Sequence, residues 1–146
     1  ATVDSGAYLD AFAAAPQLTI TSVACPNFVE SVERGVTTGD EITAIAEKYF
    51  APLKAADIDT LVLGCTHYPL LTGVISYVMG NGVTLVSSAD ETAKDLYRIL
   101  VEHHLLRSQD SGAPTYKFVS TGDSATFASL ARRFLGPEVV KVDTSL

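Results

Sequence analysis

The chain has 146 residues, of which 47% are hydrophobic and 18% are charged, and its formal net charge is −7. This length fits one ordinary domain, and this composition is typical of a soluble globular protein. The acidic balance, with lysine and arginine scattered along the chain, argues against nucleic acid or an anionic membrane surface as the main partner.

The first part of the chain is predicted to hold three helices and one strand. Pro26 suits the first position of a helix and Gly35 is a good helix stop. Thr38 and Glu41 have the spacing of a capping box at the start of the next helix. The predicted elements are a helix over 3–15, a β-branched strand over 18–25, a helix over 26–35 and a helix over 38–56.

The rest of the chain alternates strands and helices. The strand over 60–65 is apolar throughout, as expected of a parallel strand covered on both faces, and Ser88 and Glu91 are predicted to cap the long helix. This alternation indicates an α/β fold with a mainly parallel sheet. The elements are strand 60–65, helix 69–79, strand 83–88, helix 89–106, a polar loop over 107–114, strand 115–121, helix 124–135 and strand 138–143.

Cysteine usage and hydropathy indicate a cytoplasmic protein. Two cysteines do not make a disulfide framework. Residues 61–89 lack charged side chains, but His67, Pro69 and several glycines interrupt them, so no apolar run approaches the ~20 residues of a membrane span. The start of the chain has no basic region of the kind that opens a signal peptide. We therefore expect no membrane contact.

The segment LVLGCTHYPLL, residues 61–71, is the candidate active site. Cys65 ends a predicted parallel strand, where open α/β sheets bind their ligands. The helix predicted to follow from Pro69 favours a thiolate at this position. His67 is close enough in sequence to pair with that thiolate or pass a proton, and Thr66 offers a hydroxyl and a backbone N–H to a carboxylate. The pattern predicts a thiol that is active near neutral pH.

Other readings of these residues remain open at this point. A cysteine at a strand end is often a small packing residue. A zinc site would need ligands beyond Cys65 and His67, and Cys25 stands 40 residues upstream without a local partner. The adjacent His103 and His104 fit an exposed or partly buried helix face. No phosphate-binding glycine loop, nucleophile elbow or dinucleotide fingerprint occurs.

The segment LVLGCTHYPLL resembles the second signature of the glutamate racemases, in the cofactor-independent Asp/Glu racemase family. Further segments are similar to that family in the same order, so the resemblance covers essentially the whole chain. The Gly-Cys-Thr-His-Tyr-Pro run is specific, because aspartate and hydantoin racemases place other residues after the cysteine. The further segments are ATVDSGAY, VACPNFVESVERG, VSSADETA and the late STGD…FLG.

The resemblance implies a three-layer, flavodoxin-like parallel-sheet fold, incomplete at the N-terminus. It implies an isomerase that interconverts L- and D-glutamate without a cofactor or metal and supplies D-glutamate for peptidoglycan. One thiolate removes the α-proton and a thiol on the opposite face returns one. Cys65 matches the thiol that deprotonates L-glutamate, and His67 matches the histidine that assists it. Thr66 and His67 match substrate-contacting residues, and Glu33 matches an acidic residue that tunes the histidine. From the residues alone, Glu33 would be a solvated helix residue.

The sequence also departs from the family pattern. The family's first catalytic cysteine and its substrate-contacting Asp-Ser pair are not matched. Cys25 lies in an Ala-Cys-Pro stretch that is a separate family feature, so we expect a buried structural thiol.

We therefore expect the C-terminal portion of a racemase. Residues 1–87 would form most of the second α/β domain without its opening strand, and residues 88–146 would be closing elements of the first. Such a fragment is expected to be inactive alone, and its unpaired strand edges predict a homodimer or other association. The alternatives are a single-cysteine decarboxylase or racemase relative, and a non-catalytic binding module.

Overall fold

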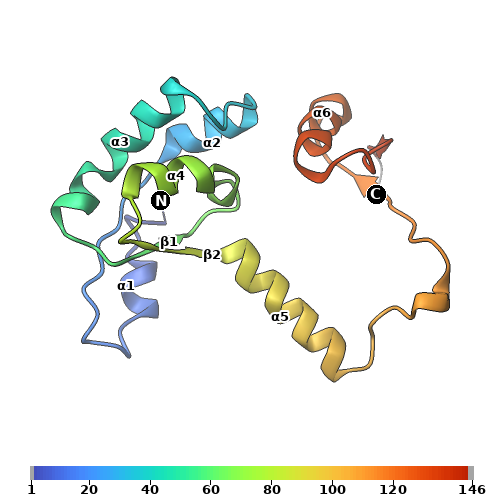
Figure 1. Cartoon of the computed structure of the whole chain (residues 1–146), viewed down its shortest axis with the longest axis horizontal. Coiled ribbons are helices and arrows are strands. Elements are labelled where there is room, and N and C mark those ends of the chain that lie inside the picture. Colours follow the sequence, from blue (N-terminus) through green and yellow to red (C-terminus); the bar gives the residue numbers. More distant parts are fainter. Residues whose placement is uncertain (1, 145–146) are drawn as a thin grey trace. The chain divides into compact units, whose positions relative to one another are not determined.

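The computed structural model describes residues 2–144 and shows two compact units, which separate between Tyr97 and Arg98 (Figure 1). The division falls inside helix α5 (Ser88–Glu102). No helix in the described part of the chain is long and apolar enough to cross a membrane.

The first unit is built on two parallel strands joined through a helix. β1 (Thr60–Leu63) pairs with β2 (Thr84–Ser87), with Thr60 opposite Thr84. Parallel strands need a crossover connection, and η1 (Tyr68–Leu71) and α4 (Thr72–Met79) provide it. Figure 1 shows α4 on one side of the strands together with α2 (Pro26–Glu33) and α3 (Asp40–Ala55), and α1 (Ala7–Ala11) on the other. The α/β parallel-sheet prediction is confirmed.

The core of this unit lies between α2, α3 and α4. Phe28 is 1% exposed and forms T-shaped contacts with three aromatic rings, at centroid distances of 5.3 to 5.7 Å. These are the rings of Tyr49, Phe50 and Tyr68. The helical spacing of Ile42, Ile45, Ala46 and Tyr49 predicts one apolar face of α3. Ile42 and Ala46 are fully buried there, and the other two are half-buried. This aromatic cluster joins α2 and α3 to the chain segment that follows β1.

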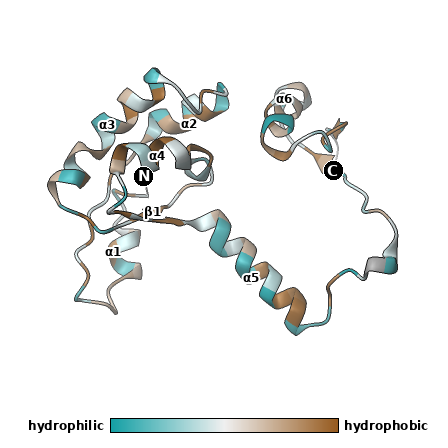
Figure 2. Cartoon of the chain, in the orientation of Figure 1, coloured by the Kyte–Doolittle hydropathy of each residue, from teal (hydrophilic) through white to brown (hydrophobic). Residues whose placement is uncertain are grey.

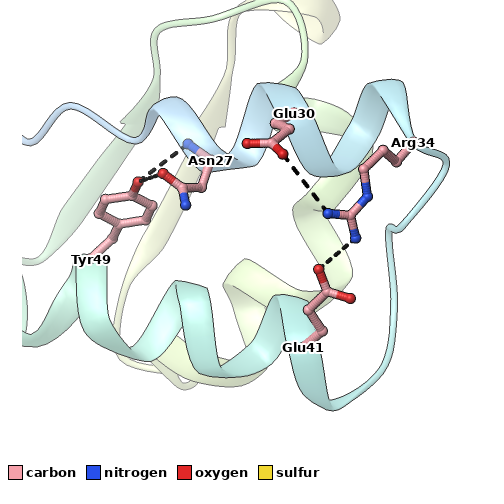
Figure 3. Close-up of polar contacts among 5 residues, drawn as sticks. All are labelled: Asn27, Glu30, Arg34, Glu41 and Tyr49. Carbon is pink, nitrogen blue, oxygen red and sulfur yellow. Dashed lines mark hydrogen bonds and ion pairs between the residues drawn. The ribbon is translucent and has the colours of Figure 1, made fainter.

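Polar contacts hold α2 against α3 at both ends (Figure 3). The Tyr49 hydroxyl donates to Asn27 Oδ1 at 2.7 Å and accepts from the Asn27 backbone N–H at 3.2 Å. Arg34 binds Glu41 at 2.6 Å, and its other terminal nitrogen lies 4.0 Å from Glu30. The contacts that reach from α3, those of Tyr49 and Glu41, help to fix α2, at whose end Glu33 lies.

Both predicted capping boxes are wrong. α3 begins after Gly39, which has a φ of 97° and forms no side-chain cap, because Glu41 is bound to Arg34 instead. At the start of α5, Ser87 rather than Ser88 accepts the free N–H of Asp90, at 3.2 Å. In a capping box the acidic side chain turns back to accept the N-cap backbone N–H. Here Arg34 binds Glu41 and Lys94 binds Glu91, so neither carboxylate turns back in this way.

The strand predicted over 18–25 is also wrong, since these residues form no ladder with any described segment. Strand propensity expresses the fit of a residue to neighbours on a sheet, and β1 pairs only with β2 among the described residues. β1 is also less covered than predicted, since Val62, on one of its faces, is 48% exposed. No residue of α5 is buried, although apolar and polar stretches alternate along this helix (Figure 2).

The second unit contains α6 (Ser124–Leu135), which matches its predicted bounds, and the short helix η2 (Gln109–Ser111). β3 (Phe118–Val119) and β4 (Val142–Asp143) pair in parallel and are shorter than predicted, because only two register positions are bonded. Asp123 accepts the Thr126 backbone N–H at 2.7 Å and caps α6. This hydrogen bond lowers the pKa of Asp123.

Candidate functional site

The turn after β1 presents Cys65 as a free, half-buried cysteine. Its backbone is held by hydrogen bonds to three consecutive carbonyl groups, so the end of the strand has little freedom to rotate. The donors come from separate parts of the first unit. The Ser88 hydroxyl donates to Leu63 at 3.1 Å, the Tyr8 hydroxyl to Gly64 at 3.0 Å and the Tyr68 N–H to Cys65 at 3.3 Å.

Thr66 and His67 follow this cysteine in the chain, and the fold brings Glu33, at the end of α2, into contact with His67. His67 Nε2 lies 2.7 Å from Glu33 Oε1, and His67 Nδ1 lies 3.3 Å from Thr66 Oγ1. The two side chains of the pair are 27% and 54% exposed, so the contact adds little stability and acts mainly on orientation. When Nε2–H of a neutral imidazole donates to Glu33, the unprotonated Nδ1 is an acceptor, and the Thr66 hydroxyl can donate to it.

Cys25 has a different environment from Cys65. It is 4% exposed, and its Sγ lies 3.8 Å from the Val23 carbonyl oxygen. The Tyr68 hydroxyl donates to the Cys25 carbonyl at 3.3 Å. Burial, and to a smaller extent electrostatic repulsion from Cys65, raises the pKa of Cys25 to about 11. The buried thiol predicted for Cys25 is therefore confirmed, and it is protonated at neutral pH.

Alkylation should be strongly suppressed at Cys25. A pKa raised from 9.0 to about 11 lowers the reactive thiolate fraction about 100-fold at pH 8, and burial hinders the reagent further. We expect iodoacetamide to modify Cys25 at least about 100-fold more slowly in the folded chain than in guanidinium, as followed by peptide mass spectrometry. Cys65 in the same samples is the internal control. Equal Cys25 rates in the two solvents would contradict this environment.

Within residues 2–144, no group of three or more His, Cys, Asp or Glu side chains could hold a metal ion. His103 and His104 are exposed. This is one of the two environments predicted for them, an exposed or a partly buried helix face.

The sequence reasoning missed two residues that hold the turn. The sequence places Tyr8 on one apolar face of the helix predicted over 3–15, and it predicts only a helix cap for Ser88. Tyr8 lies 56 residues from Gly64 and Ser88 lies 25 residues from Leu63. Both contacts are tertiary, so neither leaves a local pattern that could be found in the sequence.

The chain is similar to proteins named glutamate racemase, although no family model matches it. It is 59% identical over 142 residues to the glutamate racemase of Parafrankia sp., covering 97% of this chain and 51% of that protein. The crystal structure of the Bacillus anthracis isoform RacE1 has a TM-score of 0.84 and 37% identity, covering 99% of this chain and 54% of the other. The Francisella tularensis enzyme in complex with D-glutamate has a TM-score of 0.83 and 30% identity, covering 99% and 54%. The chain thus spans about half the length of these relatives.

Proposed function

The chain belongs to the glutamate racemase family and corresponds to the C-terminal portion of its members, and we propose that it contributes one face of an active site that interconverts L- and D-glutamate. The observation that carries this proposal is the turn after β1. There a half-buried free thiol lies on a tightly bonded backbone, two residues from a histidine oriented by a carboxylate.

The proposed chemistry moves one proton at each face of the α-carbon. The Cys65 thiolate takes the α-proton of L-glutamate and becomes a thiol, and a thiol on the opposite face protonates the resulting carbanion to give D-glutamate. The α C–H is a very weak acid, so a positioned base has to be combined with preorganised donors for the carboxylates and exclusion of water. No cofactor is required for these two transfers.

The other residues of the turn have supporting roles in this proposal. His67 assists Cys65 in the transfer and contacts the substrate, and Glu33 holds the imidazole by the 2.7 Å contact. Thr66 offers its backbone N–H and hydroxyl to a substrate carboxylate. Cys25 is not the opposing thiol, because it is buried and its pKa is about 11. The opposing thiol therefore comes from outside the residues described.

We also propose the context in which the chain works. Residues 1–87 form most of the second racemase domain, and residues 88–146 are closing elements of the first. The exposed apolar side chains of α5, among them Leu96 and Ile99, support the view that further chain covers them. The enzyme supplies D-glutamate for peptidoglycan in the cytoplasm. Self-association of the isolated chain through its unpaired strand edges stays a prediction.

A chimera tests the function directly. This chain replaces the matching segment of the Parafrankia racemase, with which it shares 59% identity. We expect the chimera to racemise glutamate in both directions, measured by circular dichroism and by α-deuteration in D₂O, and the isolated chain to show no racemisation. A folded chimera that only decarboxylates an acid, or only binds glutamate, would contradict the proposal and favour the decarboxylase or the binding module.

Removing the Glu33 carboxylate should release the imidazole of His67. In the isolated chain we expect long-range ¹H–¹⁵N spectra to show the Nε2–H tautomer, and Glu33→Ala to give a mixture of tautomers. In the chimera the same change should lower kcat roughly tenfold or more, since a misoriented histidine loses part of the 10²–10⁴-fold that a positioned acid–base group contributes. Glu30→Ala, three residues earlier on α2 and 4.0 Å from Arg34, is the matched control. An unchanged tautomer in Glu33→Ala would contradict the orienting role.

A further inference from the structure

Tyr8 links α1 to the turn that carries Cys65. Its hydroxyl donates to the Gly64 carbonyl at 3.0 Å, across 56 residues of sequence. α1 has only five residues and none of them is buried. The helix is therefore poorly anchored by apolar packing, and this hydrogen bond is a specific contact between it and the end of β1.

The tyrosine ring also packs directly over Gly64. A Cβ placed on Gly64 would overlap the Tyr8 hydroxyl oxygen and lie 2.9 Å from Tyr8 Cζ. The ring can therefore approach this closely only because Gly64 has no side chain. Ring and hydroxyl together restrict the peptide that joins Gly64 to Cys65.

The neighbouring carbonyl groups show why this contact matters for the thiol. Leu63 is held by Ser88 at 3.1 Å, and Cys65 is held by the Tyr68 N–H at 3.3 Å. Without the Tyr8 hydroxyl, the Gly64 carbonyl between these two points loses its donor. The Gly64–Cys65 peptide can then rotate, and such rotation swings the Cys65 side chain.

We propose that Tyr8 is a positioning residue for Cys65, which it serves by fixing the Gly64 carbonyl at the end of β1. The inference rests on the proposed function, in which Cys65 carries the proton. A displacement of about 1 Å between a base and its carbon costs about 10²-fold in rate, so a small rotation of this peptide has a large effect on proton transfer. Tyr8 touches neither the thiol nor the substrate in this role.

Tyr8→Phe tests the proposal, because it keeps the ring and removes the donor. In the isolated chain we expect the Tyr68 amide, which bonds to Cys65, to exchange with deuterium at least tenfold faster, while the α3 amides keep their rates. In the chimera we expect kcat to fall at least tenfold with KM changed less than twofold. Tyr77→Phe is the matched control, because Tyr77 is 78% exposed. We expect it to change neither quantity.

The outcomes separate this proposal from the proposed function. Unchanged Tyr68 exchange in Tyr8→Phe overturns the positioning role, whatever the activity of the chimera. Faster exchange with unchanged kcat overturns its importance for the reaction. If racemisation by the chimera survives Cys65→Ala, the proposed function is overturned. The amide exchange experiment needs no activity, so it still decides whether Tyr8 holds the turn. Gly64→Ala, which displaces the ring, should reproduce the faster exchange and the lower kcat.

Discussion

Cys65→Ala in the chimera is expected to abolish racemisation in both directions, with kcat reduced at least about 10³-fold. A positioned proton-transfer group contributes about 10²–10⁴-fold, and each direction of the reaction uses Cys65 once, as base for L-glutamate and as acid for the reverse reaction. Racemisation is measured by circular dichroism from each enantiomer, and α-proton exchange is measured by NMR in D₂O.

The exchange experiment makes this prediction specific to one face of the substrate. Without Cys65, the opposing thiolate can still remove the α-proton of D-glutamate and return a deuteron to the same face. We therefore expect exchange to be lost for L-glutamate and to persist in part for D-glutamate. Equal loss for both enantiomers, in a chimera that still binds glutamate, would indicate that Cys65 does not serve a single face.

Cys25→Ser is the matched control for Cys65→Ala. Cys25 lies outside the proposed machinery, and a serine hydroxyl there can donate to the Val23 carbonyl that the thiol already contacts at 3.8 Å. The chimera should keep its racemisation within a few-fold. If instead Cys25→Ser abolished racemisation and Cys65→Ala left it intact, the roles assigned to the two thiols would be reversed.

Phe28→Ala is expected to lower the free energy of unfolding of the chain by about 3–5 kcal/mol, the usual cost of removing a buried aromatic ring. The side chain is 1% exposed and meets three other rings. Because whole domains are stable by only about 5–15 kcal/mol, the variant should be largely unfolded in mild urea. Denaturant titration followed by far-UV circular dichroism measures the loss.

This change should also disturb the candidate site. The ring of Tyr68 packs against Phe28, while its N–H and hydroxyl bind the carbonyl groups of Cys65 and Cys25. We therefore expect Cys25 to become accessible to iodoacetamide in Phe28→Ala under conditions where the parent chain protects it. Tyr77→Ala removes an aromatic ring that is 78% exposed and should change stability by less than about 0.5 kcal/mol. A loss below about 1 kcal/mol in Phe28→Ala would contradict the central place of this ring.

Local patterns in the sequence were sufficient for several elements and drew attention to the turn that carries Cys65. Pro26 and Gly35 delimit α2, and the apolar spacing of Ile42 and Ala46 predicts the buried face of α3, because helix ends and helical periodicity depend on residues only a few positions apart. The Gly-Cys-Thr-His run likewise indicated a thiol at a strand end. Its resemblance to the racemases led to the family that the comparisons show.

Only the tertiary structure decided which side chains support that turn. Glu33 and His67 are 34 residues apart, and Tyr8 and Gly64 are 56 apart. The resemblance alone suggested the first contact, and nothing in the sequence suggested the second. The strand predicted over 18–25 failed because a strand exists only with a partner. The two capping boxes failed because Arg34 and Lys94 hold the acidic side chains. Propensity and periodicity are properties of neighbouring residues, whereas these hydrogen bonds depend on where the folded backbone brings distant ones together.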